Sequence, residues 1–524
     1  MKFVRNKWAL LCLYFVVTLL LDHLIFDFGN LNVFNYVILK GVFFIFLILL
    51  LKNYKKMRFL KTKFFWVFCI IFGVLFIFLY PGSWLGSDIY LIYDKAIMCD
   101  YYYHLNYLTT VFYIFSFMLI PLPVAPVIMQ ILLSAVVFSY VAEKTRITFC
   151  LGNKRIWILL VPFVLAHSIF YILYPNRPII FGLLALSLYV TLFCDYYRRQ
   201  NFVNSKIIVA IAFVTAVLSN IRAEAVFLVL VIPLLVFITY RIKPTRKNIL
   251  KYGLLFLLLF IGIGIPQKAH ELFNQSEYER QIRKLPSYIS PLSLMLSDDE
   301  ISVTEEEIMI IDKVLNVKDL KNYASYYDVP CIWRSEQCVR VFNEEEFKSF
   351  QRTFLSIIFR NKRLFLDAKF KVFWASTSLG APDHFTTFDI FQSEDDILLQ
   401  HPLMKPVINY NLRRDLYRVL EGKTDSEFIN VQYLIFNNLI ICLVAIVVST
   451  VYFMYKRRSV PIMINIVVLG NALIVFLTAP AAYFMYYFYA YLWGWYMICL
   501  LLMKCNFGRK VWCSGRRRRG LSMI

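Results

Sequence analysis

A series of uncharged apolar runs constrains this chain most, because each approaches the roughly 20 residues that a helix needs to cross a bilayer. Backbone polar groups in lipid must pair internally, so runs of this length predict helices. A chain with 60% hydrophobic residues also has too little polar surface for a soluble protein of 524 residues. We therefore expect an all-α polytopic membrane protein with about twelve spans, at residues 8–26, 33–51, 64–80, 124–142, 156–173, 178–196, 206–221, 223–240, 249–266, 432–455, 460–479 and 483–503.

Charge placement orients these helices. Residues 266–431 hold 26 of the 34 carboxylates and only 21 of the 56 basic residues, so this segment carries −5 and the rest of the chain +27. Loops rich in Lys and Arg mark the cytoplasmic side and attract anionic membrane lipids. We expect both termini in the cytoplasm, residues 266–431 outside it, and a bacterial-type inner (plasma) membrane. A nucleic-acid partner would need a basic face with stacking aromatics on a soluble module, which the sequence does not show.

One apolar run does not fit this alternation. Leu105–Ile120 is short, and if it crossed the membrane the later basic clusters up to Lys251 would lie outside. We expect a re-entrant or juxtamembrane helix here. Three parts follow: residues 1–265, a transmembrane module with a first outer loop at 81–104; residues 266–431, an extracytoplasmic domain; and residues 432–524, the last spans and a basic cytoplasmic tail.

The extracytoplasmic domain should be mainly helical. Glu344–Phe373 has apolar residues at helical spacing, which pack either a small core or the membrane surface. A second helical pattern covers Pro406–Leu420, and Asp298–Glu307 is typical of a solvated loop that enters a helix. Cys331 and Cys338 either form a disulfide, if this segment lies outside the cytoplasm, or remain free.

The first outer loop contains the densest group of polar candidates. It runs from Tyr80 through Ser87 and Asp88 to the aromatic stretch that ends at His104, and we expect the extracytoplasmic domain to cover it. A carboxylate at the membrane–water boundary can take the proton from a hydroxyl that attacks a lipid-linked donor. Alternatively, Asp88 only caps the helix that follows.

Two outer turns add arginines on the same side of the membrane. Arg177 lies in the short turn 174–178, and Arg222 and Glu224 interrupt an apolar stretch. Arginines at this level can bind a phosphate or pyrophosphate through paired hydrogen bonds. The structural alternative is that Arg222 and Glu224 neutralise each other and that Arg177 reaches the lipid headgroups. Nucleotide-binding and hydrolase motifs are absent from the sequence.

The order of these features resembles the GT-C-fold membrane glycosyltransferases, which include polyprenyl-phosphate-sugar transferases and the protein O-mannosyltransferase-like group. The resemblance rests on the Tyr-Pro-Gly-x-Trp-x-x-Ser-Asp loop, the short run after His104, the helix with Gln130, the two Arg-containing turns and the Tyr-rich stretch at 479–491. It implies an inverting transfer of sugar from a polyprenyl-phosphate-linked donor to an extracytoplasmic glycan, glycolipid or protein. Asp88 is the implied catalyst, with Arg177 and Arg222 near the donor phosphate, and His104 and Glu224 are further substrate-binding candidates.

The sequence also departs from this family. Ile89 follows Asp88 where many members have a second acidic residue, and Pro178 stands where an Asp is common. We therefore expect no metal and no cofactor. Two other functions stay open: a surface-polysaccharide polymerase or ligase, which would use outer arginines such as Arg413, Arg414 and Arg418, and a non-enzymatic transporter or flippase of lipid-linked sugars.

Overall fold

The computed structural model describes residues 2–53, 57–84, 87–102, 105–198, 205–327, 329, 331–332, 337–377, 402–405, 409–421, 435 and 437–503. Within these ranges the protein is helical, and the only β pairing is an isolated antiparallel bridge between Leu315 and Val339. The all-α class expected from the apolar runs is confirmed.

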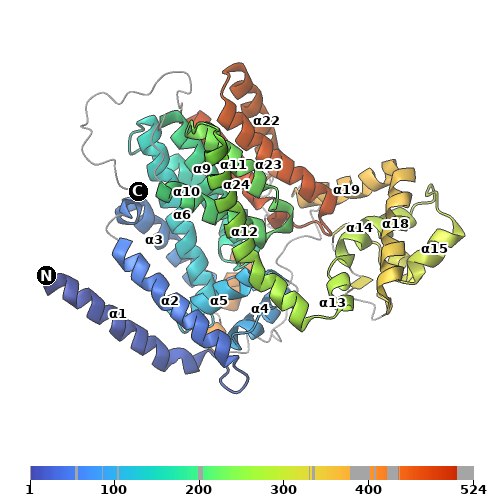
Figure 1. Ribbon diagram of the computed structural model, residues 1–524, viewed down its shortest axis with the longest axis horizontal. Coiled ribbons are helices and arrows are strands. Elements are labelled where there is room, and N and C mark those ends of the chain that lie inside the picture. Colours follow the sequence, from blue (N-terminus) through green and yellow to red (C-terminus); the bar gives the residue numbers. More distant parts are fainter. Residues whose placement is uncertain are drawn as a thin grey trace.

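The apolar helices form one bundle, with the polar helices to one side of it (Figure 1). Six described helices are long and apolar enough to cross a membrane, or up to seven if a bent pair counts as one span. The expected number of about twelve spans therefore remains a prediction. The helices of the bundle are α1 (Lys2–Leu21), α2 (Val33–Asn53), α3 (Lys63–Phe78), α4 (Ser87–Ile97), α5 (Tyr107–Leu119), α6 (Ala125–Phe149), α7 (Val161–Val164), α8 (Ala166–Ile172), α9 (Arg177–Arg198), α10 (Ser205–Ile221), α11 (Leu228–Thr239), α12 (Arg246–Asn274), α22 (Leu439–Tyr455), α23 (Ser459–Thr478) and α24 (Phe488–Leu502).

Short 3₁₀ turns connect several of these elements: η1 (Asp22–Leu24), η2 (Arg58–Lys61), η3 (Arg155–Leu160), η4 (Ala223–Ala225), η6 (Pro402–Met404) and η7 (Phe484–Tyr487).

The span expected at 156–173 is not one continuous helix. This stretch consists of η3, α7 and α8, and the two halves meet at an angle of 69°. Leu165 between them has extended backbone angles, which end the first half. The apolar run 105–120 forms the short helix α5, whose N-terminus is capped by the Asn106 side chain.

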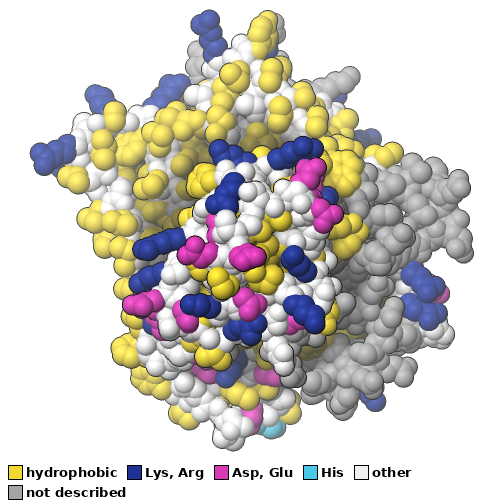
Figure 2. Space-filling view, turned by 90° about the vertical axis from the view of Figure 1, so that its right-hand side faces the viewer, with side chains coloured by type: hydrophobic (Ala, Val, Ile, Leu, Met, Phe, Trp, Pro, Cys, Tyr) yellow, Lys and Arg dark blue, Asp and Glu magenta, His cyan; other side chains and the backbone are white. Residues whose placement is uncertain are grey.

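A second group of helices forms the insert domain, defined here as residues 275–376. It comprises α13 (Glu277–Ile282), α14 (Leu285–Leu296), α15 (Glu305–Asp312), α16 (Val317–Asn322), α18 (Glu344–Arg360) and α19 (Lys362–Ser376). These helices bury a hydrophobic core separate from that of the bundle. Figure 2 looks onto the insert domain and shows acidic and basic side chains interspersed on its surface, with hydrophobic side chains beside them. Helix α12 continues through Pro266 to Asn274, so the expected boundary at residue 266 falls inside a helix.

The apolar stripe of Glu344–Phe373 packs this core. Phe347, Phe350, Phe354 and Ile357 of α18 are buried, and the ring of Tyr288 contacts the first three. The stripe is divided between two helices, because α18 ends at Arg360 and α19 begins at Lys362. The acidic loop does enter a helix, because Thr304 and Glu307 form a capping box at the start of α15.

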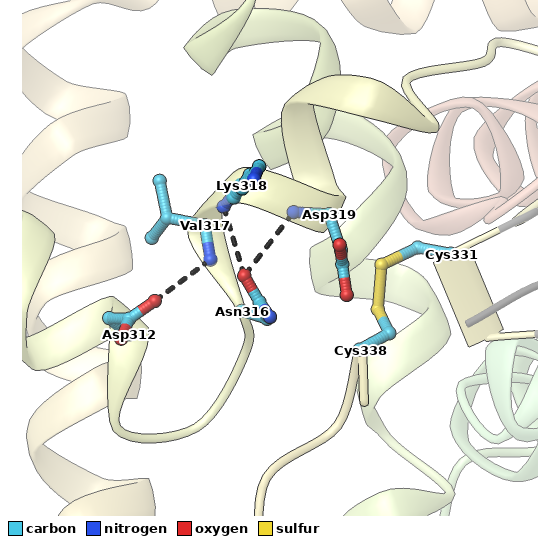
Figure 3. The surroundings of a disulfide bond; sticks show 7 residues. All are labelled: Asp312, Asn316, Val317, Lys318, Asp319, Cys331 and Cys338. Atoms are coloured by element: carbon cyan, nitrogen blue, oxygen red, sulfur yellow. Dashed lines mark hydrogen bonds between the residues drawn. A yellow bond between two sulfur atoms is a disulfide. The ribbon is translucent and has the colours of Figure 1, made fainter. Parts of the chain in front are cut away.

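Cys331 and Cys338 form a disulfide with a Cα–Cα distance of 5.6 Å (Figure 3). The backbone N–H of Asn316 donates to the carbonyl of Cys338 at 2.9 Å. The Asn316 side chain then caps α16 by accepting from the backbone N–H groups of Lys318 and Asp319 (Figure 3). The disulfide and the capped helix thus stabilise the same corner of the insert domain.

The insert domain contacts the bundle at the segment between α23 and η7. Lys369 of α19 donates to the carbonyl of Ala479 at 3.1 Å, and the N–H of Ala482 donates to the carbonyl of Tyr327 at 2.9 Å. The ring of Phe373 lies 5.8 Å from Phe476 and 5.6 Å from Tyr487. This segment leads directly into the aromatic residues that surround Arg222.

Candidate functional site

Arg222 and Glu224 come together because the chain reverses between α10 and α11. Arg222 follows the last turn of α10 with extended backbone angles, and η4 starts at the next residue. The hydroxyl of Ser219 donates to the carbonyl of Ala225 at 3.1 Å and closes the reversal. Its geometry places both charged side chains on the same side of the turn, where Nε of Arg222 donates to Oε1 of Glu224 at 2.7 Å.

The Arg222 guanidinium is buried against two aromatic rings. It is 6% exposed, and its central carbon lies 5.2 Å from the ring centre of Tyr486 and 5.8 Å from that of Phe181. Both Nε and Nη2 donate to Glu224, whereas Nη1 is buried and has no hydrogen-bond partner among the described residues. Buried polar groups are nearly always hydrogen-bonded, so Nη1 leaves a donor for an anionic ligand.

Arg177 begins α9, in the same helix as Phe181, and its positive charge acts on the Glu224 carboxylate. Arg177 therefore lies near enough to the Arg222–Glu224 pair for its charge to act on the carboxylate. Arg222 and Glu224 do pair, as the structural alternative expects. With Arg177 included, the three groups still carry one net positive charge, and Nη1 of Arg222 remains a donor. We call Arg177, Arg222 and Glu224 the arginine site.

Gln130 of α6 fixes the turn before Arg177. Its side-chain nitrogen donates to the carbonyls of Tyr171, Ile172 and Tyr174 at 2.6 to 3.1 Å. The hydroxyl of Tyr113 donates to the carbonyl of Pro175 at 2.7 Å. A polar residue in an apolar run signals such a role, although the sequence could not identify the three carbonyls as its partners.

The loop that precedes Asp88 is attached to this same turn. The N–H of Ser83 donates to the carbonyl of Leu173 at 2.9 Å. Leu173 precedes Arg177 by four residues, so their Cα atoms lie at most about 14 Å apart. We call residues 79–84 the 79–84 loop. The turn at 173–177 thus connects this loop to the arginine site.

Asp88 lies in the first turn of α4, and its side chain is outside the described part of the structure. His104 lies outside the described residues altogether. The structure therefore brings together Arg177, Arg222 and Glu224 and leaves the roles of Asp88 and His104 as predictions. Helix α4 packs against α5, with Ile89, Ile92 and Ala96 buried.

Residues of the polar segment 266–431 contact the 79–84 loop. They belong to η6 and to α20 (Tyr410–Glu421): Arg413 and Tyr417 donate to carbonyls of the loop, and the carbonyl of Leu403 accepts from the Tyr80 side chain. The sequence suggested Arg413 only as one of several outer arginines; it is 2% exposed and points to the loop carbonyl of Gly82.

Within the described residues no three His, Cys, Asp or Glu side chains are placed to hold a metal ion. Metal-free chemistry remains a prediction. Comparisons with protein-family models, with curated proteins and with solved structures find no match to this chain.

Proposed function

We propose that this protein is a GT-C-type membrane glycosyltransferase. It would move a sugar from a polyprenyl-phosphate-linked donor to a glycan, glycolipid or protein on the extracytoplasmic side. The observation that carries this proposal is the arginine site, which combines a buried guanidinium, an unused N–H donor and a second arginine at the end of an apolar bundle. A lipid-linked phosphate provides the oxygen acceptors and the hydrocarbon chain that such a site can bind.

The proposed chemistry uses Asp88 as a general base. An acceptor hydroxyl attacks the anomeric carbon of the donor sugar, and its proton moves to the Asp88 carboxylate. The bond between that carbon and the phosphate oxygen breaks, and the polyprenyl phosphate leaves with the electron pair. Arg177 and Arg222 stabilise the negative charge that develops on the leaving phosphate.

This function requires a particular topology. Both termini lie in the cytoplasm, about twelve segments cross an inner membrane, and α5 lies at its outer surface. The insert domain and α20 lie outside and cover the 79–84 loop. A polymerase or ligase that binds its substrate through Arg413 is less well supported, because this side chain is buried against Gly82.

Binding of a short-chain isoprenyl phosphate tests the proposal at the arginine site. The purified protein in detergent should bind the phosphate and should not bind the corresponding isoprenol. Arg222→Gln should lower the affinity at least about 10-fold, because one charge-assisted hydrogen bond to a phosphate is worth roughly 1.5 to 3 kcal/mol. Arg246→Gln, at the exposed start of α12, is the charge-matched control. Equal affinity for the phosphate and the isoprenol would refute phosphate recognition.

A further inference from the structure

Helix α20 and the preceding η6 turn hold the 79–84 loop through side-chain to backbone hydrogen bonds. Four contacts join them. Tyr80 Oη donates to the carbonyl of Leu403, and Arg413 Nη2 donates to the carbonyl of Gly82 at 3.2 Å. Tyr417 Oη donates to the carbonyl of Leu79 at 3.3 Å and lies 3.4 Å from Ser83 Oγ. Two segments more than 300 residues apart in the sequence thus meet at one loop.

Arg413 lies on the buried face of an otherwise amphipathic helix. Tyr417 lies one turn further along this face, and the guanidinium carbon is 5.2 Å from its ring centre. The neighbouring Leu412, Arg414 and Asp415 are exposed. Burying a guanidinium is unfavourable unless it is hydrogen-bonded, so its position on the buried face indicates a specific role for the contact with Gly82.

The opposite side of the loop is also fixed. Gly82 has φ = 94°, and a Cβ atom at this position would lie 2.8 Å from the carbonyl oxygen of Leu173. Ser83 donates to that same carbonyl. The loop is therefore held between the turn that leads to Arg177 and the helix that carries Arg413, and α4 begins four residues after Ser83, at Ser87.

The geometry points to Arg413 as a positioning residue. Its guanidinium fixes the carbonyl of Gly82, and through the loop it sets where the first turn of α4 begins relative to the arginine site. This inference rests on the proposed function in one respect, namely that Asp88 in that turn accepts the proton. In this role Arg413 acts through the loop carbonyl rather than on the substrate.

Sugar transfer by Arg413 variants is the first readout. Arg413→Gln should lower kcat by about 100-fold, the loss that an error of about 1 Å in positioning a reacting group causes, with the donor KM within about threefold of wild type. Arg413→Lys should recover kcat to within about 10-fold, because an ammonium can still donate to Gly82. Lys405→Gln, an exposed residue of the same segment, is the charge-matched control and should leave kcat unchanged.

The second readout does not depend on activity. A Ser83→Cys reporter in the full-length protein is reacted with a maleimide, and labelling at position 83 is followed by mass spectrometry. Ser83 is fully buried, so the reporter should be protected when Arg413 is present. It should react at least about 10-fold faster with Arg413→Gln. If Arg413→Gln does not fold, Arg413→Lys provides the comparison with a milder change and should label at a rate between those of wild type and of a loop released from Arg413.

Reduced kcat together with faster labelling supports the inference. Reduced kcat with unchanged labelling overturns it, because Arg413 would then act on the substrate rather than on the loop. Faster labelling with normal kcat overturns it as well, because the loop position would not matter for transfer. If the wild type transfers no sugar from any polyprenyl donor, the proposed function fails, and the labelling alone decides whether Arg413 holds the loop.

Discussion

Replacement of Lys369 by Met should stabilise the contact between the insert domain and the bundle at neutral pH. Lys369 is 1% exposed and donates to the carbonyl of Ala479. Burial lowers the pKa of its ammonium from 10.5 to about 8. The folded protein therefore keeps a charged amine in a poorly solvated position at pH 7.

The size of the effect follows from this change in pKa. A shift of about 2.5 pH units corresponds to roughly 3 kcal/mol at 1.36 kcal/mol per unit. Between pH 8 and 10.5 the unfolded chain binds one more proton at this residue than the folded chain. Stability therefore rises with pH through this window, and the full penalty is present below pH 8.

Thermal unfolding in detergent between pH 7 and 10.5 tests this reasoning. The wild type should be less stable than Lys369→Met by the largest amount at pH 7, and most of that difference should disappear by pH 10.5. Lys362→Met, at the exposed start of the same helix, is the control for loss of a positive charge. A difference between wild type and Lys369→Met that is constant with pH would refute a buried charged amine.

Three further changes test other contacts. Cys338→Ser should destabilise the insert domain by about 2.5 kcal/mol, the loop-closure entropy expected for a sequence separation of seven residues, and a reductant should lower the melting temperature of the wild type by more than that of the variant. Gly494→Ala should destabilise the bundle by roughly 1 to 3 kcal/mol, because its Cβ would lie 2.5 Å from Cβ of Cys442, whereas Gly470→Ala has open space and should be tolerated in the same melting assay. Gln130→Met should lower the melting temperature by removing the donor for three carbonyls of the turn before Arg177, at a cost of roughly 2 kcal/mol or more; an unchanged melting temperature would contradict this role.

The sequence predicted the helical class and the helical nature of the polar segment. Both depend on local patterns: long apolar runs, and the 3.6-residue spacing of Phe347, Phe350 and Phe354. The sequence did not predict the 69° bend between η3–α7 and α8, because one extended residue at Leu165 ends a helix that composition alone would continue. It also placed the domain boundary at residue 266, where the apolar run ends and the acidic segment begins, yet α12 continues to Asn274.

The candidate site was predictable to a lesser degree. Charges inside an apolar stretch marked Arg222 and Glu224, and a charge in a short outer turn marked Arg177; the structure places these three in one region. The rings of Phe181 and Tyr486 reach Arg222 because α9 and η7 are in contact, and no local pattern in the sequence reveals that contact. The contact of Arg413 with Gly82 has the same origin, since it joins residues 331 positions apart.

Sugar transfer by Asp88→Asn tests the central claim most directly. Three membrane preparations contain equal amounts of wild type, of Asp88→Asn, or of the control Asp94→Asn, which changes a carboxylate later in α4. Each is supplied with radiolabelled polyprenyl-phosphate-sugar donors, and label in the acceptor fraction is counted. The account predicts transfer by wild type and by Asp94→Asn, and a loss of at least about 100-fold with Asp88→Asn, the contribution expected of a general base. Undiminished transfer by Asp88→Asn would contradict the role of Asp88, and no transfer by wild type from any such donor would contradict the glycosyltransferase itself.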